Sequence, residues 1–253
     1  MENIKRVLSF TRRAIDDYKM ISAGDKIAVG ISGGKDSLTL LCALSQLRRF
    51  YPEPFEIVAI TVNMGLEGMD FSAVEELCRR LDVPYHTVPT EIYKIIFEVR
   101  KEANPCALCA KMRRGALHTA AKELGCNKVA LGHHFDDVVE TFMLNLFFEG
   151  RLGCFQPVTY LSRMDIHLIR PMIYMPEKDV RYFANKAGLP TVKSTCPADG
   201  ATEREEMKKL LATLERENKG LRYRIFGAIQ RGGIDGFHQV GRMTGMKDYE
   251  SEE

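Results

Sequence analysis

The sequence predicts an α/β fold with an open, mostly parallel sheet of about five strands and helices on both faces. Short apolar runs, typical of buried strands, alternate with helical patterns almost to residue 190. The helical stretches are long enough for crossover connections, which join parallel strands in right-handed units. An amphipathic N-terminal helix precedes this pattern, and a short helical C-terminal region follows it.

Each element is predicted from its own local pattern. The buried strands are expected at Lys26–Ile31, Phe55–Asn63, Val83–Val88, Lys128–Gly132 and Ile166–Arg170. The helices are expected within 1–20 and near 37–49, 70–82, 108–124, 137–149, 177–187, 201–217 and 219–229. Glycine and proline after residue 150 indicate an irregular connection, and residues 241–253 resemble a frayed acidic tail. We therefore divide the chain into an N-terminal helix (1–22), a main α/β domain (23–195) and a C-terminal helical region with its tail (196–253).

Composition sets limits on function. The 253 residues include 36 Lys and Arg against 34 Asp and Glu, so no overall positive field by itself indicates nucleic acid binding. No apolar run is long enough to cross a membrane, and the first residues lack a signal-peptide pattern, so we expect a cytoplasmic protein with no membrane contact. The odd number of cysteines, seven, argues against a disulfide framework and for metal, redox or core roles.

A short glycine loop joins the first strand to its helix and is the strongest signal in the chain. It consists of Ser32, Gly33, Gly34, Lys35, Asp36 and Ser37. The two glycines allow the backbone to approach a ligand, and the free N–H groups at the start of the helix favour an anion. The serines add hydroxyl groups, Lys35 either contacts phosphate or is solvated, and Asp36 can help to hold hydrated magnesium. The loop has neither a GxxxxGK[ST] nor a GxGxxG spacing, and the alternative is a simple tight turn.

Two further loops are expected at the same edge of the sheet, where ligands bind in open parallel sheets. Asn63 and the two residues after it follow the second strand and suit backbone contacts to a nucleobase. The segment Leu131–Asp137 follows the strand that begins at Lys128, and it contains His133, His134 and two aspartates. These side chains suit magnesium ligation, helix capping or acid–base work. The structural alternative is that an aspartate caps the helix while the histidines are solvated.

A CxxC motif, Cys106 and Cys109, opens a helix and is followed closely by basic residues. Both features lower thiol pKa values and suit metal ligation or sulfur chemistry. The motif alone is compatible with a redox dithiol, half of a zinc site or part of an iron–sulfur site. Cys196, in a loop before a polar helix, is the best candidate for a third ligand, with Cys154 or Cys126 as alternatives. Cys42 and Cys78 fall within helical patterns and are expected in the core.

Several other polar residues have two interpretations each. Arg170, at a strand end, either faces phosphate or an RNA backbone or makes a surface ion pair. Glu140 and Thr141 either support the predicted magnesium site or lie on the helix surface. Basic pairs such as Lys208 and Lys209 are solvated surface unless several of them line one face beside the pocket.

Taken together, the motifs resemble those of a known family. The loop SGGKDS resembles the pyrophosphate-loop signature of the ATP pyrophosphatase (PP-loop) superfamily, and LGHHFDDVVETFMLN resembles the second block of the tRNA 2-thiocytidine synthetase family, TtcA. CALC, GRLGCFQP and IRPMIYMPEKDV resemble that family in order and approximate spacing. The resemblance covers about Met20 to Cys196, and it implies an adenine nucleotide alpha hydrolase-like fold.

The resemblance also implies an activity, namely ATP-dependent transfer of sulfur to a tRNA base, with 2-thiocytidine as the product. The base oxygen attacks the α-phosphorus of ATP, pyrophosphate leaves, and sulfur then displaces AMP. Members of this kind hold a [4Fe–4S] cluster on three cysteines, and the corresponding metal-binding and catalytic cysteines here are Cys106, Cys109 and Cys196. The ATP-binding residues implied are Ser32, Gly33, Gly34, Lys35, Asp36, Ser37, Asn63, Gly132 and His133, with Asp137 holding Mg²⁺. A cysteine desulfurase or free sulfide is the expected sulfur donor.

Other functions stay open at this point. The chain could be a PP-loop thiolase for another base or a small molecule, although it lacks the paired CxxC motifs that usually end the uridine-modifying group. A lysidine-type ligase shares the loop but lacks the CALC motif. A non-catalytic ATP or iron–sulfur sensor would bind both ligands without releasing pyrophosphate. A homodimer through the amphipathic first helix is also expected, unless that helix packs against the sheet edge.

Overall fold

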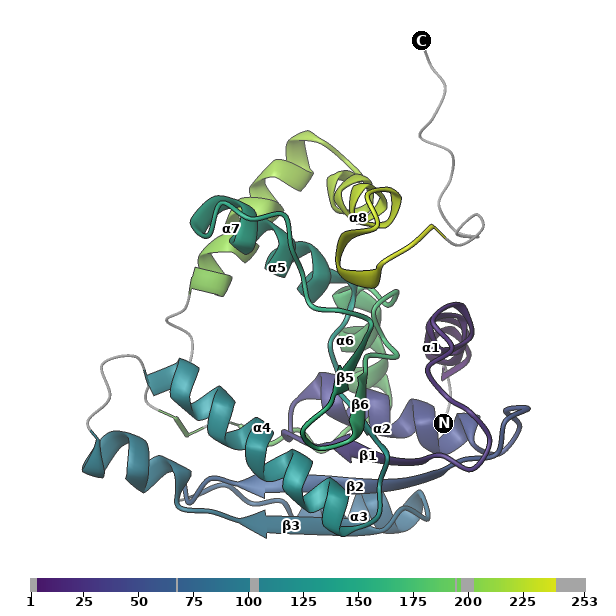
Figure 1. Ribbon diagram of the computed structural model, residues 1–253, viewed down its shortest axis with the longest axis vertical. Coiled ribbons are helices and arrows are strands. Elements are labelled where there is room, and N and C mark those ends of the chain that lie inside the picture. Colours follow the sequence, from purple (N-terminus) through teal and green to yellow (C-terminus); the bar gives the residue numbers. More distant parts are fainter. Residues whose placement is uncertain (1–3, 67, 101–104, 194, 197–202, 240–253) are drawn as a thin grey trace.

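Six strands form a single sheet in the order β3-β2-β1-β4-β6-β5 (Figure 1). The computed structural model describes residues 4–66, 68–100, 105–193, 195–196 and 203–239. The strands are β1 (Lys26–Gly30), β2 (Glu56–Asn63), β3 (Tyr85–Pro89), β4 (Lys128–Ala130), β5 (Val158–Leu161) and β6 (Ile166–Ile169). All neighbours pair in parallel except β5, which runs antiparallel to β6 at the edge. The predicted open, mostly parallel sheet is confirmed.

Helices cover both faces of this sheet (Figure 1). They are α1 (Ile4–Asp17), α2 (Lys35–Leu47), α3 (Ser72–Arg80), α4 (Pro105–Glu123), α5 (Phe135–Phe148), α6 (Glu177–Lys186), α7 (Glu203–Glu217) and α8 (Leu221–Arg231). A π-helical turn, η1 (Lys94–Val99), precedes α4, and a 3-10 turn, η2 (Ile234–Gly236), follows α8. Among the described residues, none of these helices combines the length and apolarity needed to cross a membrane.

The core lies in two layers, one on each side of the sheet. On one face, α4 packs Leu117 and Ala121 against Val129 and Leu168 of the strands. On the other face, a larger cluster joins the sheet to α1, α2, α3, α5 and α6. Because parallel strands are apolar on both faces, each layer removes strand side chains from water.

The strand order reverses at β1, and this reversal places the functional loops. From β1 the chain moves outward to β2 and β3, and then returns to the other side of β1 as β4. The loops that follow β1 and β4 therefore leave two adjacent parallel strands at the same edge of the sheet, where the strands' carboxyl ends lie. Open α/β sheets bind ligands at such a reversal point, outside the carboxyl ends of the strands.

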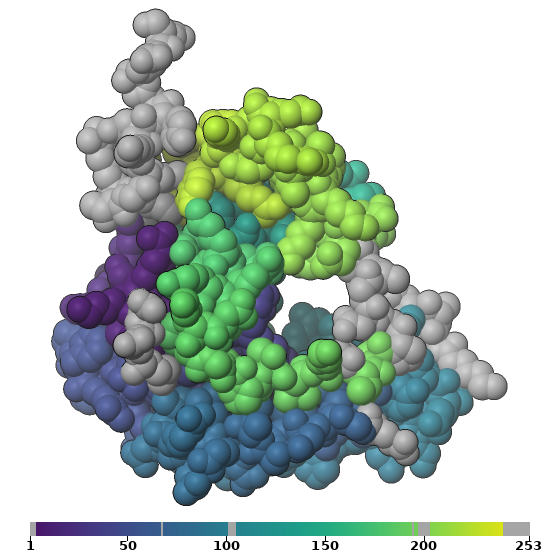
Figure 2. Space-filling model, turned by 180° about the vertical axis from the view of Figure 1, so that it is seen from behind, coloured from purple at the N-terminus to yellow at the C-terminus, as the bar shows by residue number. Residues whose placement is uncertain are grey.

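The helices α7 and α8 pack against α5 and rise beyond the sheet (Figure 1). On the opposite face of the molecule, Figure 2 shows a hollow between α7 and the chain that follows α6. The division of the chain at residue 195 stays a prediction, and the tail expected at 241–253 lies outside the described residues.

Two elements differ from the sequence prediction. The edge strand β5 was expected as irregular connection because its four residues are only partly buried and alternate weakly. In α1, the apolar face that suggested a homodimer includes Val7, Ala14 and Ile15, which are buried within this chain. The helix packs against α2 and α6. It therefore packs within its own chain, as the alternative to a homodimer expected, although against helices and not against the sheet edge.

Candidate functional site

The glycine loop between β1 and α2 is held in shape by its two serines. Ser37 Oγ accepts a hydrogen bond from the Ser32 amide at 3.2 Å and donates one to the Gly34 carbonyl at 2.9 Å. Gly33 has a φ of 83°, and a Cβ there would lie 2.9 Å from Cβ of Val192, so a side chain is excluded. The first amides of α2, after its N-cap Gly34, have no acceptor within the helix and form an anion site.

The loop after β4 presses directly on this glycine loop. A Cβ at Gly132 would meet the backbone of Asp36 and Ser37 at 3.0 Å. Gly132 is therefore required by close approach of two backbone segments rather than by a positive φ. The contact fixes the distance between the phosphate loop and the start of α5.

The two histidines of this second loop have different roles. His134 is the N-cap of α5: its Nδ1 accepts from the Asp137 amide at 3.4 Å, and Asp137 Oδ2 accepts from the His134 amide at 2.9 Å. This reciprocal pair is a capping box with histidine in the capping position. The His133 ring packs on Phe155 at 4.8 Å, and burial followed by the charge of Arg170 lowers the pKa of His133 to about 4. Its buried Nδ1 has no hydrogen-bond partner in the described chain.

An acidic cluster at the start of α5 faces arginines from the C-terminal helices. Arg204 of α7 lies 3.4 Å from carboxylate oxygens of both Asp137 and Glu140. Arg222 of α8 lies 2.7 Å from Asp136 Oδ1. Burial, followed by the charge of Asp137, raises the pKa of Glu140 to about 7, and its buried Oε1 makes no hydrogen bond within the described residues. The region 203–231 therefore supplies cations to the nucleotide end of the sheet, which the sequence did not reveal.

Lys35 is drawn out of the loop toward α6. Its Nζ lies 3.1 Å from Asp36 Oδ1 and 3.1 Å from Glu177 Oε1, so it is an ion-paired side chain rather than a solvated one. Glu177 also contacts Lys208 and Arg181 at 3.3 Å. Burial opposes its ionisation, but these cations, Lys35 above all, lower the pKa of Glu177 to about 2.

Two sequence candidates turn out to stabilise loops. The Asn63 side chain accepts a hydrogen bond from the Gly65 amide at 3.0 Å, and so it shapes the turn after β2. Arg170 is buried, donates to Thr159 Oγ1 at 3.1 Å and covers the Phe155 ring at 5.0 Å. Its burial excludes the predicted surface ion pair, and the predicted contact of Arg170 with phosphate or an RNA backbone stays a prediction. Burial lowers the pKa of Arg170 to about 10.

The CxxC motif lies at the start of α4, against the loop that follows β2. Cys109 Sγ lies 3.6 Å from Met64 Sδ. Burial raises the pKa of the Cys109 thiol, Arg113 opposes this effect, and the charges of Cys196 and Cys106 raise it further. Cys106 and Cys196 therefore both lie near enough to act on the Cys109 thiol. As they stand, the described residues contain no group of three His, Cys, Asp or Glu side chains in an arrangement that would hold a metal ion.

The remaining thiols have core surroundings. Cys42, Cys78 and Cys126 are buried, as expected for the first two. Cys154 donates to the Val138 carbonyl at 3.4 Å, and burial raises its pKa to about 12. Cys154 thus makes its contact at α5, whereas the thiol charges that act on Cys109 come from Cys106 and Cys196.

Comparison with known proteins agrees with this site. A model of the PP-loop domain family matches residues 7–215. A tRNA-cytidine(32) 2-sulfurtransferase of Geobacter sulfurreducens is 40% identical over 228 residues, which cover 89% of each chain. The enzyme of the same name from Citrifermentans bemidjiense is 40% identical over 227 residues, covering 88% of this chain and 89% of that one. This chain belongs to the TtcA-like family of PP-loop proteins.

Solved structures show the same fold. The U34-tRNA thiolase NcsA from Methanococcus maripaludis, determined with its [4Fe–4S] cluster, aligns with a TM-score of 0.75 and 26% identity. The alignment covers 94% of this chain and 80% of NcsA. An NH3-dependent NAD synthetase from Campylobacter jejuni aligns with a TM-score of 0.50 at 13% identity, which is a likeness of fold alone.

Within this PP-loop site, sequence reasoning missed Glu177 and Arg204, which are charged residues in helical patterns, where most charges are solvated. The signal for Glu177 was its position, because it opens a helix directly after a proline. Arg113, one of the basic residues expected to act on the CxxC thiols, does lower the pKa of Cys109.

Proposed function

We propose that this PP-loop protein is an ATP-dependent sulfurtransferase that converts a cytidine of tRNA to 2-thiocytidine. One observation carries the proposal: the phosphate loop and the CxxC helix lie at the same edge of the sheet. The loop follows β1, and Cys109 touches Met64, which follows the neighbouring strand β2. A nucleotide bound at the first can therefore share one chamber with sulfur held at the second.

The loop residues suit a triphosphate. The α2 amides and the hydroxyl groups of Ser32 and Ser37 bind phosphate oxygens, and the absence of a side chain at Gly132 keeps the second loop close to them. The unpaired Nδ1 of His133 offers a further nucleotide contact in its uncharged form. The residues for Mg²⁺ are Asp137 and Glu140, because a buried carboxyl group with a raised pKa becomes a good ligand when a divalent cation compensates its charge.

The cysteine set suits an iron–sulfur cluster. Cys106, Cys109 and Cys196 would hold it, since Cys106 and Cys109 lie at the start of α4 and the charges of Cys106 and Cys196 both act on the Cys109 thiol. A [4Fe–4S] cluster on three thiolates supplies one iron without a protein ligand, at which sulfur can bind. Arg113, which lowers the pKa of Cys109, helps to balance the negative charge there.

The chemistry divides between the two halves of the site. The cytidine oxygen at C2 is a poor leaving group, so it first attacks the α-phosphorus of ATP and pyrophosphate departs. The α2 amides stabilise the departing pyrophosphate, and Lys35, whose Nζ lies 3.1 Å from Glu177 Oε1, can exchange that carboxylate for a phosphate oxygen. Hydrosulfide then attacks C2 and loses its proton, and AMP leaves with the former base oxygen, so that one oxygen is exchanged for one sulfur at the sulfide level.

The proposal includes three finer expectations. A cysteine desulfurase or free sulfide provides the sulfur, and the reaction takes place in the cytoplasm, where tRNA is available. The third expectation is a homodimer, which would use a surface other than the buried apolar face of α1.

The proposal is tested with protein whose cluster is reconstituted anaerobically and then supplied with ATP, Mg²⁺, sulfide and bulk tRNA. Pyrophosphate release and thionucleosides are measured in the same reaction, the latter by mass spectrometry. We expect 2-thiocytidine from the wild type and none from Cys109→Ala. The matched control is Cys126→Ala, because the Cys126 thiol is buried in the core and is not one of the three proposed cluster ligands.

The alternatives give different products. A uridine thiolase would form 2-thiouridine instead, and NcsA, the similar solved structure, is a U34-tRNA thiolase. A sensor would bind nucleotide and cluster while releasing no pyrophosphate. Either result would overturn the assignment to cytidine thiolation.

A further inference from the structure

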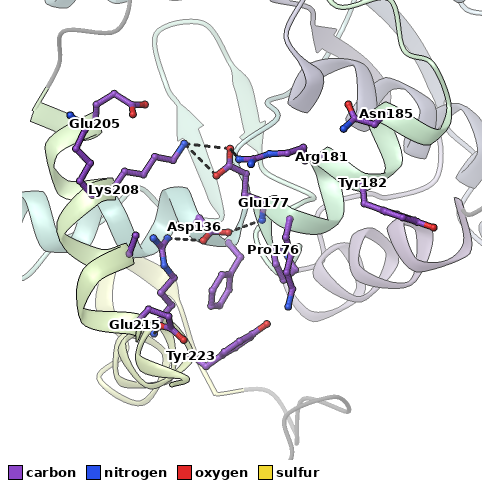
Figure 3. Close-up of a pocket in the computed structure, with 15 residues that line it drawn as sticks. Asp136, Pro176, Glu177, Arg181, Tyr182, Asn185, Glu205, Lys208, Glu215 and Tyr223 are labelled. Carbon is purple, nitrogen blue, oxygen red and sulfur yellow. Dashed lines mark hydrogen bonds and ion pairs between the residues drawn. The ribbon is translucent and has the colours of Figure 1, made fainter. Parts of the chain in front are cut away.

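A cavity of about 820 Å³ lies beside the nucleotide site, between α6 and α7 (Figure 3). Five of its residues come from α6: Glu177, Lys178, Arg181, Tyr182 and Asn185. Five come from the facing side of α7: Glu205, Lys208, Lys209, Ala212 and Glu215. Two helices thus present matched faces to a common space, with α8 and the start of α5 at its floor.

The cavity is lined by two kinds of cation, those in ion pairs and those without a partner among the described residues. At the floor the cations are already paired, because Arg222 contacts Asp136 at 2.7 Å, and Lys208 and Arg181 share Glu177 (Figure 3). The exposed side chains of Lys178 on α6 and Lys209 on α7 also line the cavity, and they make no hydrogen bond or ion pair within the described residues. A small anion needs cations that converge on one point, whereas unpaired lysines on two separate helices suit a chain of phosphates.

An exposed aromatic ring, that of Tyr182, comes from the α6 side of the cavity. Tyr182 is 54% exposed, and Figure 3 shows its ring extending away from the ion-pair network at the floor. Bases of single-stranded nucleic acid stack on such rings, while lysines follow the backbone. Glu177 joins this cavity to the phosphate loop, because it pairs with Lys35 as well as with Lys208.

We propose that the cavity between α6 and α7 binds a single-stranded segment of the RNA substrate, outside the reaction chamber. Lys178 and Lys209 contact its phosphates, and Tyr182 stacks on one base. Glu205 lies on α7, like Lys209, and has no hydrogen-bond or ion-pair partner within the described residues, so its negative charge repels the RNA phosphates. The inference rests on the proposed function for the identity of the RNA, but RNA binding is measured without turnover.

The test measures binding of bulk tRNA to the full chain by fluorescence anisotropy, from 50 to 300 mM salt. For Lys178→Ala/Lys209→Ala we expect about tenfold weaker binding at 150 mM salt, and a salt slope reduced by about 1.4, or 0.7 for each lost phosphate contact. The matched control is Lys122→Ala/Lys219→Ala, two exposed lysines outside the cavity lining, which should change neither quantity. Circular dichroism confirms that each variant is folded.

Substitutions at two further positions should change RNA affinity in ways that a general loss of positive charge would not. Glu205→Gln should strengthen binding, by about threefold. Tyr182→Ala should weaken it about fivefold, whereas Tyr182→Phe, which keeps the ring, should bind as the wild type does. Equal loss in the cavity and control doubles, or wild-type affinity in the cavity double, would overturn the proposal. These outcomes are separate from failure of the proposed function, which would appear as absence of 2-thiocytidine in wild-type reactions whatever the affinity.

Discussion

Replacing Gly132 with alanine tests whether close contact between two loops sets the geometry of the phosphate site. The new Cβ would lie 3.0 Å from backbone atoms of Asp36 and Ser37, and ordinary contacts begin near 3.4 Å. The loops must therefore separate by about 0.4 Å, because neither contact is with a flexible side chain. A misplacement of about 1 Å costs roughly a hundredfold in rate, so we expect about a tenfold loss in kcat/KM for ATP.

The assay is pyrophosphate release at saturating tRNA and varied ATP, with a thermal melt of the same preparation. Overpacking between backbone segments should also destabilise the chain by about 1–3 kcal/mol. Gly115→Ala is the control, because a Cβ there meets nothing within 4 Å and alanine favours a helix interior by about 1 kcal/mol over glycine. If Gly132→Ala releases pyrophosphate as fast as Gly115→Ala, the contact does not position the phosphates and the argument is refuted.

Three other predictions concern the thiols and two carboxyl groups. Cys196→Ala should prevent cluster reconstitution, seen as loss of iron and of visible absorbance, while Cys154→Ala should retain it; the reverse result would make Cys154 the ligand. Glu177 has a pKa near 2 in the folded chain and about 4.5 when unfolded, so it stabilises the fold above pH 4.5 and this contribution is lost as the pH falls toward 2. Glu177→Gln should accordingly lower the free energy of unfolding at pH 7 by up to about 3 kcal/mol in urea denaturation, and equal midpoints would contradict the ion pair with Lys35. Glu140 has the opposite shift, a pKa near 7, so without Mg²⁺ its stabilising contribution is present below pH 4.5 and is lost as the pH rises through 7. The melting temperature of Glu140→Gln should therefore exceed that of the wild type at pH 8 and approach it at pH 5; a constant difference between the two pH values would contradict the shifted carboxyl group.

Much of the fold was predictable because its signals are local. The strands β1, β2 and β4 are buried apolar runs, and the helices between them carry periodic apolar faces. The short edge strand β5 was not predictable, since strand pairing with β6 rather than its own four residues decides its conformation.

The candidate site was predictable only in part, for the same reason. Gly33 and Gly132 could be predicted because the fold leaves no room for a side chain at either position, and the glycine itself is visible in the motif. The roles of charged residues do not, because Arg204 or Glu177 on a helix looks like ordinary solvated surface until its neighbour is known. The sequence could not decide whether Arg170 makes a surface ion pair, and it is the packing of Phe155 that buries this side chain.

The sequence by itself determined the phosphate loop, the thiol pair at a helix start and the alternation of strands and helices, because each of these depends on backbone conformation over a few residues. Only the tertiary structure decided which distant groups meet. The reversal of strand order at β1 brings the loops after β1 and β4 into backbone contact, and packing of α7 on α5 carries Arg204 to Asp137. Such contacts join residues far apart in the chain, and their energy depends on distance and burial that no local pattern encodes.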